Sequence, residues 1–299
     1  MPSTAIDRPA KNEPPEEVVQ RLFKRIGEVS TLPTVAITII EVANDSSTGA
    51  DDLFDAVCID AALATRIMRT VNSSYYSVQN KVADLKLAIT LLGFKEIRNL
   101  AMTAYIAQLF KKGSGHGTYT REALWNHLIG TGAVAQLIAQ TCGRVPPREA
   151  YLAGLLHDLG LILIDQYLNK PFCKVIDALE KDTPTCETEK TILGFDHTEL
   201  GEFVARQWHL PDHLATVIRY HHRPLDCEND HREMVCAVAL ADFFCNVKGL
   251  SALGVADAQM PPSEVFDVLR LSKSEVSSMW EQLDELLQAA NVMSIMPKA

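Results

Sequence analysis

Histidine and aspartate residues that could bind metal occur in an ordered series along the second half of the chain. His157 and Asp158 are adjacent in the segment GLLHDLG, and His221 and His222 are adjacent in VIRYHH. The other candidates lie on separate segments: His127, His197 and Asp242. Imidazole and carboxylate together suit iron, manganese or zinc and require no thiolate. The series therefore predicts a site for one or two divalent transition-metal ions, iron or manganese, with zinc as the alternative.

Each of the two adjacent pairs, His157-Asp158 and His221-His222, can contribute both side chains to one site only at certain places on a helix. Neighbouring side chains on a helix diverge by about 100°, so both can face one site only where the helix ends. Gly160 follows the first pair and Arg223-Pro224 follows the second, and both are helix-breaking positions. Asp158 is the candidate bridging ligand, because a carboxylate can bind two cations whereas an imidazole binds one. Two bridged ions about 3.5–4 Å apart could generate hydroxide for attack on a phosphoester.

Each candidate also has an ordinary structural explanation when taken alone. His127 would be a core histidine, Asp158 a capping carboxylate beside its histidine, and His221-His222 a solvated helix end. Asp242 differs, because it lies in the apolar run VALADFF, where an unpaired carboxylate is costly to bury. We therefore predict that all seven candidates converge on one cavity. Arg219 and Arg223 lie beside them and either neutralise a bound phosphate or face solvent.

Helical periodicity predicts the elements that must position these residues. Apolar residues recur at helical spacing, as in Val18, Leu22 and Ile26, and β-branched runs are short and lie inside helical patterns. The chain is therefore predicted to be all-α. Beyond a first helix that starts near Glu17, the predicted helices are Val35–Ala43, one after Asp52, Ala61–Val71, Leu85–Leu92, Glu96–Phe110, Glu122–Thr141, Arg148–Leu156, Leu161–Tyr167, Pro171–Lys181, Thr185–Leu193, Thr198–Gln207, Pro211–His221, Arg232–Val247, Pro262–Leu269 and Lys273–Ala290.

The stretch Lys111–Thr118, rich in Gly, Ser and His, is the predicted internal boundary. It separates an N-terminal helical lobe, residues 17–112, from a metal-binding helical lobe, residues 119–250. We expect residues 1–16, which contain four prolines, to form a mobile leader and residues 251–299 to form a C-terminal helical extension.

Composition limits the class of protein. The 28 Lys and Arg against 38 Asp and Glu give a net charge of −10, which argues against a broad electrostatic grip on nucleic acid. The basic residues Lys95, Arg98, Lys111 and Lys112 are interpreted as a solvated helix face. The odd cysteine count indicates reduced thiols, and no apolar run suits a signal peptide or a membrane span. We expect a cytoplasmic protein without membrane association.

The segment from about residue 120 to 245 resembles the HD superfamily of metal-dependent phosphohydrolases. His127, His157-Asp158 and Asp242 match its H…HD…D signature, and His197, His221 and His222 match the extra histidines of its HD-GYP branch. Residues 17–250 resemble an HDOD domain, the HD-related output domain of bacterial signalling proteins. The matching blocks are LPTVAITIIEVAND, DAALATRIMRTVNSSYY, LAITLLGFKEIRNLAM and RYHH. The resemblance implies an HD-domain-like helical bundle with an N-terminal helical lobe.

Departures from the HD-GYP pattern bear on function. Leu161 stands where that branch has a phosphate-holding lysine, and Arg223-Pro224-Leu225 follows the paired histidines instead of a GYP motif. The resemblance therefore implies metal ligation rather than cyclic di-GMP hydrolysis. Our first hypothesis is a bacterial regulatory module that binds a signalling protein or a phosphorylated small ligand. The alternative is a divergent metal-dependent phosphohydrolase acting on a nucleotide or cyclic nucleotide.

Overall fold

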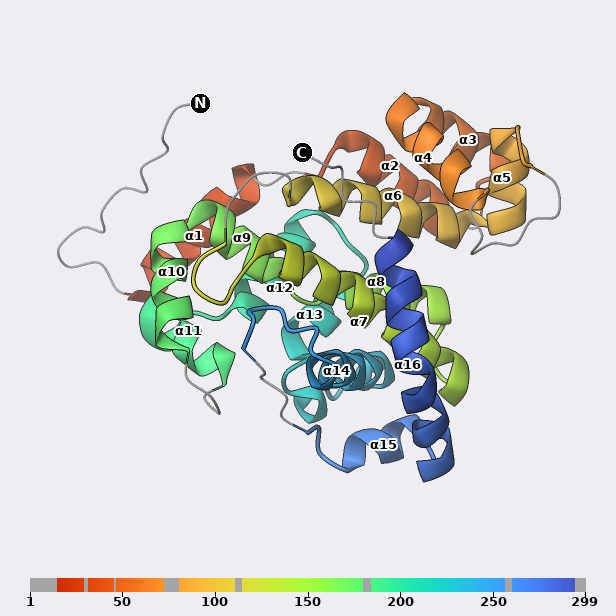
Figure 1. Ribbon diagram of the computed structural model, residues 1–299. Helices are drawn as coiled ribbons and strands as arrows, with labels where there is room; N and C mark the ends of the chain where they lie inside the picture. The colour runs from red at the N-terminus through yellow and green to blue at the C-terminus, as the bar shows by residue number, and fades with distance from the viewer. Residues whose placement is uncertain are drawn as a thin grey trace.

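The computed structural model describes residues 15–29, 32–45, 47–72, 81–110, 115–179, 184–255 and 260–293 (Figure 1). Within these ranges all regular structure is helical, and the only strand-like pairing is an isolated bridge between His116 and Tyr119. The predicted all-α class is confirmed. Most of the predicted leader lies outside the described residues, but its last two residues belong to α1 (Pro15–Val29). No helix in the described part of the chain combines the length and apolarity needed to cross a membrane.

Five helices lie together at the upper right of Figure 1 and are here called the N-terminal lobe. They are α2 (Thr34–Asn44), α3 (Ala50–Cys58), α4 (Ala61–Val71), α5 (Leu85–Leu92) and α6 (Phe94–Leu109). Side-chain caps define several of these helices: the carboxylate of Asp60 accepts hydrogen bonds from the first turn of α4, and Asp84 does the same for α5. Such a cap typically stabilises a helix by about 1 kcal/mol.

The second lobe is organised around α7 (Arg121–Cys142), which packs against α8, α14 and α16. Thr120 caps its first turn, and Gly143 ends it with a φ of 63°. Residues on all sides of α7 are buried, which is the pattern of a central core helix. The other helices of this lobe are α8 (Pro147–Leu156), α9 (Leu159–Tyr167), α10 (Asn169–Ala178), α11 (Thr185–Leu193), α12 (His197–Gln207), α13 (Asp212–Tyr220), the short η1 (Pro224–Asp226) and α14 (Arg232–Val247).

Both ends of the described chain pack on the second lobe. α1 lies against α12, where Phe23 meets Phe195 edge-on with ring centroids 4.8 Å apart and Phe203 at 5.5 Å. After α15 (Glu264–Leu269), α16 (Lys273–Met293) packs along α7, at the right of Figure 1. The division of the chain at residues 112–119 stays a prediction.

A buried ion-pair network, here called the interlobe network, joins the two lobes. Arg98 on α6 is only 1% exposed and donates hydrogen bonds of 2.8 Å to Asn44 and to Glu149 on α8. Lys95 lies 3.0 Å from the other oxygen of Glu149, and His213 on α13 lies 3.3 Å from the oxygen that Arg98 contacts. The interpretation of Arg98 as part of a solvated helix face is therefore wrong: its side chain turns inward because a buried carboxylate pairs with it.

The interlobe network also fixes the starts of two helices that end at the predicted metal site. Glu149 lies in the first turn of α8, which runs into His157, and His213 lies in the first turn of α13, which runs into His221. Burial would raise the pKa of Glu149, but the contact with His213 and the charge and hydrogen bond of Arg98 lower it well below its ordinary range. Glu149 is therefore a carboxylate near neutral pH.

Candidate metal centre

The structure brings all seven predicted site residues together, and helix ends supply most of them. His157 directly follows α8, Asp158 precedes α9, and His197 is the first residue of α12. His221 and His222 directly follow α13, so both adjacent pairs lie where a helix ends. The remaining two residues come from helix interiors: His127 of α7 and Asp242 of α14.

A glycine contact sets the distance between two of these helix ends. A Cβ atom on Gly160 would lie 1.9 Å from the carbonyl oxygen of His197, so only glycine allows α9 to approach α12 this closely. The approach places Asp158, two residues before Gly160, beside His197. Glycine at position 160 is thus required by the geometry of the site.

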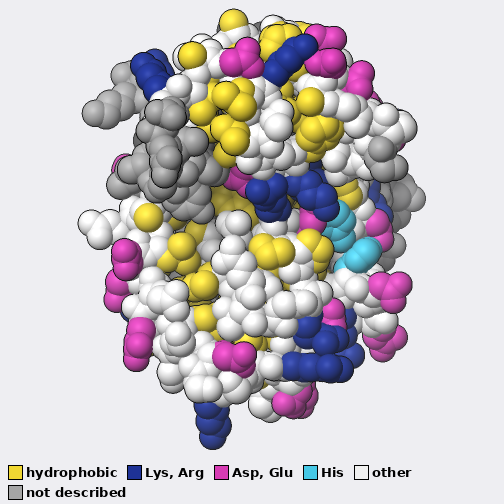
Figure 2. All heavy atoms as spheres, turned by 90° about the vertical axis from the view of Figure 1, so that its right-hand side faces the viewer, with side chains coloured by type: hydrophobic (Ala, Val, Ile, Leu, Met, Phe, Trp, Pro, Cys, Tyr) yellow, Lys and Arg dark blue, Asp and Glu magenta, His cyan; other side chains and the backbone are white. Residues whose placement is uncertain are grey.

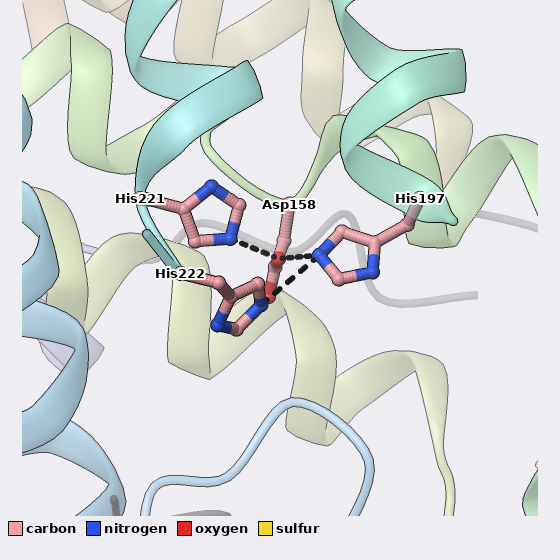
Figure 3. Close-up of side chains that lie close together, drawn as sticks. All are labelled: Asp158, His197, His221 and His222. Atoms are coloured by element: carbon pink, nitrogen blue, oxygen red, sulfur yellow. Dashed lines mark hydrogen bonds and ion pairs between the residues drawn. The ribbon is translucent and has the colours of Figure 1, made fainter. Parts of the chain in front are cut away.

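Asp158 lies at the centre of the cluster, with each carboxylate oxygen facing a different pair of imidazoles. Its Oδ1 atom lies 3.2 Å from His197 Nε2 and 3.3 Å from His221 Nε2 (Figure 3). Its Oδ2 atom lies 3.3 Å from His157 Nε2 and 3.6 Å from His127 Nε2. This is the arrangement expected of a carboxylate that bridges two ions.

Two further residues extend the two halves of the cluster. Asp242 Oδ1 lies 3.1 Å from His127 Nε2, on the Oδ2 side of Asp158. His222 Nε2 lies 3.2 Å from His197 Nε2 (Figure 3), in the group of donor atoms that also includes His221 and Asp158. The donor atoms therefore form two groups that share Asp158: one contains His127, His157 and Asp242, and the other contains His197, His221 and His222.

Hydrogen bonds at the opposite ring nitrogen fix the tautomer of four of these histidines. In each, Nδ1 faces an oxygen acceptor and donates a hydrogen bond to it, which leaves Nε2 as the atom that can bind a metal ion. The pairs are His127 with Leu250 O at 2.7 Å, His157 with Gly154 O at 2.7 Å, His197 with Glu189 Oε2 at 2.7 Å, and His221 with Ile218 O at 3.0 Å. Metal-binding histidines are held in this way.

The donor set fits divalent metal ions. The Nε2 atoms point at carboxylate oxygens, so each of these gaps takes either a proton on Nε2 or a metal ion that replaces it. Asp158 Oδ1 and His221 Nε2 are buried and have no hydrogen-bond partner. Two ligands that bind one ion at about 2.0–2.2 Å lie roughly 3–3.5 Å apart, which agrees with the separations of 3.1 to 3.6 Å observed here. A cavity of about 30 Å³ lies against Asp158, His197 and Asp242.

Electrostatics also favour positive charge at this position. Burial would raise the pKa of Asp158, but the charge of His157 and close contacts with His197 and His221 lower it well below its ordinary value. At Asp242, burial also raises the pKa, but the hydrogen bond and the charge of His127 outweigh it and lower the pKa to about 2. Both carboxylates are therefore ionised at neutral pH, and this buried negative charge requires cations beside it.

Glu189 is a site residue that the sequence analysis missed. It is fully buried on α11, and its Oε2 atom accepts hydrogen bonds from both the backbone N–H of His197, at 2.9 Å, and the Nδ1 of the same residue. Its Oε1 atom is buried without a hydrogen-bond partner. Of the four fixed histidines, only His197 is held by a carboxylate instead of a backbone carbonyl. Glu189 carried no sequence signal, because TCETEKTIL is an ordinary amphipathic pattern.

The two arginines proposed from the sequence lie in different surroundings. Arg219 donates a hydrogen bond to Thr198 at 2.8 Å and lies within 3.4 Å of Glu199 and Glu202. Its positive charge is therefore paired with carboxylates of α12. Arg223 is 46% exposed at the side chain and lines a groove of about 510 Å³ that reaches His221, His222 and Asp242. Lys190 lines the same groove but pairs with Asp196 at 3.0 Å.

The sequence profile of the HDOD domain matches residues 29–224. The chain belongs to the HDOD family. An uncharacterized protein from Treponema pallidum (strain Nichols) is 23% identical to this chain over 220 residues, which cover 73% of it. The chain spans only 42% of the length of that relative.

Solved structures agree with this HDOD membership. An HDOD domain protein with unknown function from Geobacter sulfurreducens is 26% identical, with a TM-score of 0.78 over 93% of this chain and 99% of that one. A candidate signal transduction protein from Marinobacter aquaeolei VT8 is 24% identical, with a TM-score of 0.79 over 94% of this chain and 65% of that one. A candidate phosphohydrolase from Shewanella amazonensis SB2B has a TM-score of 0.70 at 20% identity, over 93% of this chain and 98% of that one. The last two show the shared fold alone.

Proposed function

We propose that this HDOD protein is a bacterial regulatory module in signal transduction whose HD-type site holds one or two divalent transition-metal ions and takes a phosphorylated small ligand. One observation carries the proposal. Four histidines donate Nδ1–H outward and direct Nε2 inward at two ionised carboxylates. Histidines held at Nδ1 with Nε2 gathered around shared carboxylates are the arrangement of a metal-binding site, where metal ions replace the protons on Nε2.

The groove supports a phosphorylated ligand. It opens at His222, which is exposed, and at Asp242, and it carries Arg223, whose nearest carboxylate is 4.0 Å away at Asp226. Arginine is suited to phosphate, because its planar guanidinium can donate two parallel hydrogen bonds. Metal ions beside the groove would supply further positive charge to the same phosphate.

Elemental analysis of protein purified without chelator is the direct test of the metal site. We expect iron, manganese or zinc at one to two ions per chain, and we expect His221→Ala to lower that content. His116→Ala is the matched control, because His116 pairs with Asp177 on another part of the surface. Wild-type protein that binds no added Mn²⁺ or Fe²⁺ in a titration would contradict the proposal, as would equal metal contents in the two variants.

A second candidate function is hydrolysis of a phosphoester, and the complete donor set beside an open groove favours it. A pair of divalent ions lowers the pKa of water and so supplies a nucleophile at neutral pH. The chain itself would hold the substrate phosphate through Arg223 and admit it past His222. Leu161, which lines the small cavity beside Asp158, offers no hydrogen bond to phosphate.

The two candidates predict different turnover. We expect no efficient hydrolysis of cyclic di-GMP by iron- or manganese-loaded protein, because a charge-assisted hydrogen bond worth roughly 1.5–3 kcal/mol is missing at Leu161. Tight binding of a phosphorylated ligand without turnover supports the regulatory module. Robust conversion that Asp158→Ala abolishes would make the enzyme the correct assignment.

A further inference from the structure

A second cavity lies between the two lobes, away from the metal centre. It measures about 80 Å³ and is bounded by α4 and α6 of the N-terminal lobe, α7 and α8 of the second lobe, and α16. Protein interiors are close-packed, and a space of 10–15 Å³ already holds a water molecule. This cavity is therefore several waters in size, at the meeting point of three parts of the chain.

The side chains that line the cavity are mainly apolar, and many of them are small. Around the buried indole of Trp125 and the side chains of Ile129 and Leu286, five alanines leave the space open: Ala104, Ala107, Ala133, Ala289 and Ala290. This alanine-lined part of the wall offers water few hydrogen-bond partners, whereas polar side chains such as Asn99, Thr103 and Tyr151 line the rest. An apolar group that filled the space would gain contact with every wall.

Polar groups gather at the edge of this cavity. Glu96 and Gln136 line both the cavity and an adjoining open groove that also contains Lys95 and Arg148. Figure 2 shows a hollow on this side of the molecule, with hydrophobic side chains at its base and basic side chains beside it. The cavity therefore combines a mainly apolar interior with a charged entrance.

The charge at this entrance is positive, although the chain as a whole carries −10. Glu96 pairs with Arg148 at 3.4 Å. Glu149 pairs with both Lys95 and Arg98. Arg66 lines the cavity as an additional cation and has no ion-pair partner among the residues that the structure describes. A guanidinium without a counter-ion favours a planar anion that accepts two hydrogen bonds.

We propose that this interlobe cavity binds a small amphipathic carboxylate, with a short alkyl chain or a single ring among the alanines and the carboxylate at Arg66. The site is independent of the metal centre and of the function proposed for it. A ligand here would contact both lobes and α16 at once. Its binding would therefore stabilise the relative position of these three parts seen in the structure.

Octanoate is the probe for this site, and octan-1-ol is its uncharged counterpart. In calorimetric titrations of the full chain, we expect saturable octanoate binding that raises the melting temperature. Arg66→Gln should weaken octanoate binding by roughly tenfold or more, since a charge-assisted hydrogen bond is lost, and leave octanol binding unchanged. Arg69→Gln, on the same helix and outside the cavity, is the matched control and should bind as wild type.

Filling the cavity tests where the tail binds. Ala133→Leu should abolish binding of both probes, and circular dichroism checks that this variant is folded. If it is not folded, Ala289→Leu replaces it, because Ala289 is exposed on α16 and tolerates a larger side chain. The proposal is overturned if wild-type protein shows no saturable octanoate binding, if Arg66→Gln and Arg69→Gln bind alike, or if the filled variants still bind.

Discussion

Replacing Glu149 by glutamine tests the interlobe network. Glutamine keeps the shape of the side chain but removes the charge that neutralises Arg98, which is 1% exposed. Lys95 is 50% exposed at its side chain and can be rehydrated, so the main cost is the stranded guanidinium of Arg98. Removing one partner of a buried ion pair costs about 3–5 kcal/mol, and one stranded charge places this variant near 3.

Thermal and denaturant unfolding of metal-free protein measure this cost. About 3 kcal/mol corresponds to a fall in melting temperature of roughly 6–12 °C, at 2–4 °C per kcal/mol for a domain of this order of size. Glu202→Gln is the control and should cost less than about 1 kcal/mol, because its two partners keep other carboxylates: Arg206 keeps Asp212, and Arg219 keeps Glu199. The double variant Arg98→Met/Glu149→Leu should recover most of the loss. If Glu149→Gln costs no more than Glu202→Gln, the network does not join the lobes in the way described.

Three further predictions concern the centre and its surroundings. Because His127 holds the pKa of Asp242 near 2 in the folded protein, against about 3.9 in the unfolded chain, Asp242 stabilises metal-free protein above about pH 4. This contribution is lost as the pH falls towards 2, and pH-dependent melting of wild type and Asp242→Asn should show the difference disappear there. Gly160→Ala should lower both metal content and melting temperature, since the new Cβ would meet the His197 carbonyl; unchanged values would refute the close contact. In native protein at pH 8, iodoacetamide should modify exposed Cys58 and spare Cys245, whose pKa burial raises to about 12, as mass spectrometry of the digest can establish.

Local signals explain why much of the fold could be predicted from the sequence. The helices at Ala61–Val71, Leu85–Leu92, Thr185–Leu193 and Arg232–Val247 begin and end at the predicted residues. Asp60 and Asp84 cap two of them, and short breaks bound the others, so the boundaries are determined by neighbouring residues. The 3-10 turn η1 was not predicted, because three residues carry no periodicity.

The predicted site depended on residue type and order, and the structure places its seven residues within one cluster. What the sequence could not provide was pairing over long separations. Glu189 looks like any helix-surface glutamate until α11 and α12 are placed together, and His213 lies beside Glu149 only because α8 and α13 pack. Arg98 was assigned to a solvated face for the same reason.

The contact between α1 and α12 has a consequence for how the chain is made. About 170 residues separate the end of α1 from the start of α12, so at 5–20 residues per second the ribosome needs roughly 10–30 s to supply the partner. Throughout that interval Phe23 and Ile26, which are buried in the finished protein, have no surface to pack against. A nascent chain of this length exposes the apolar face of α1 to chaperones and proteases. Fragments that stop before α12 would keep that exposure permanently.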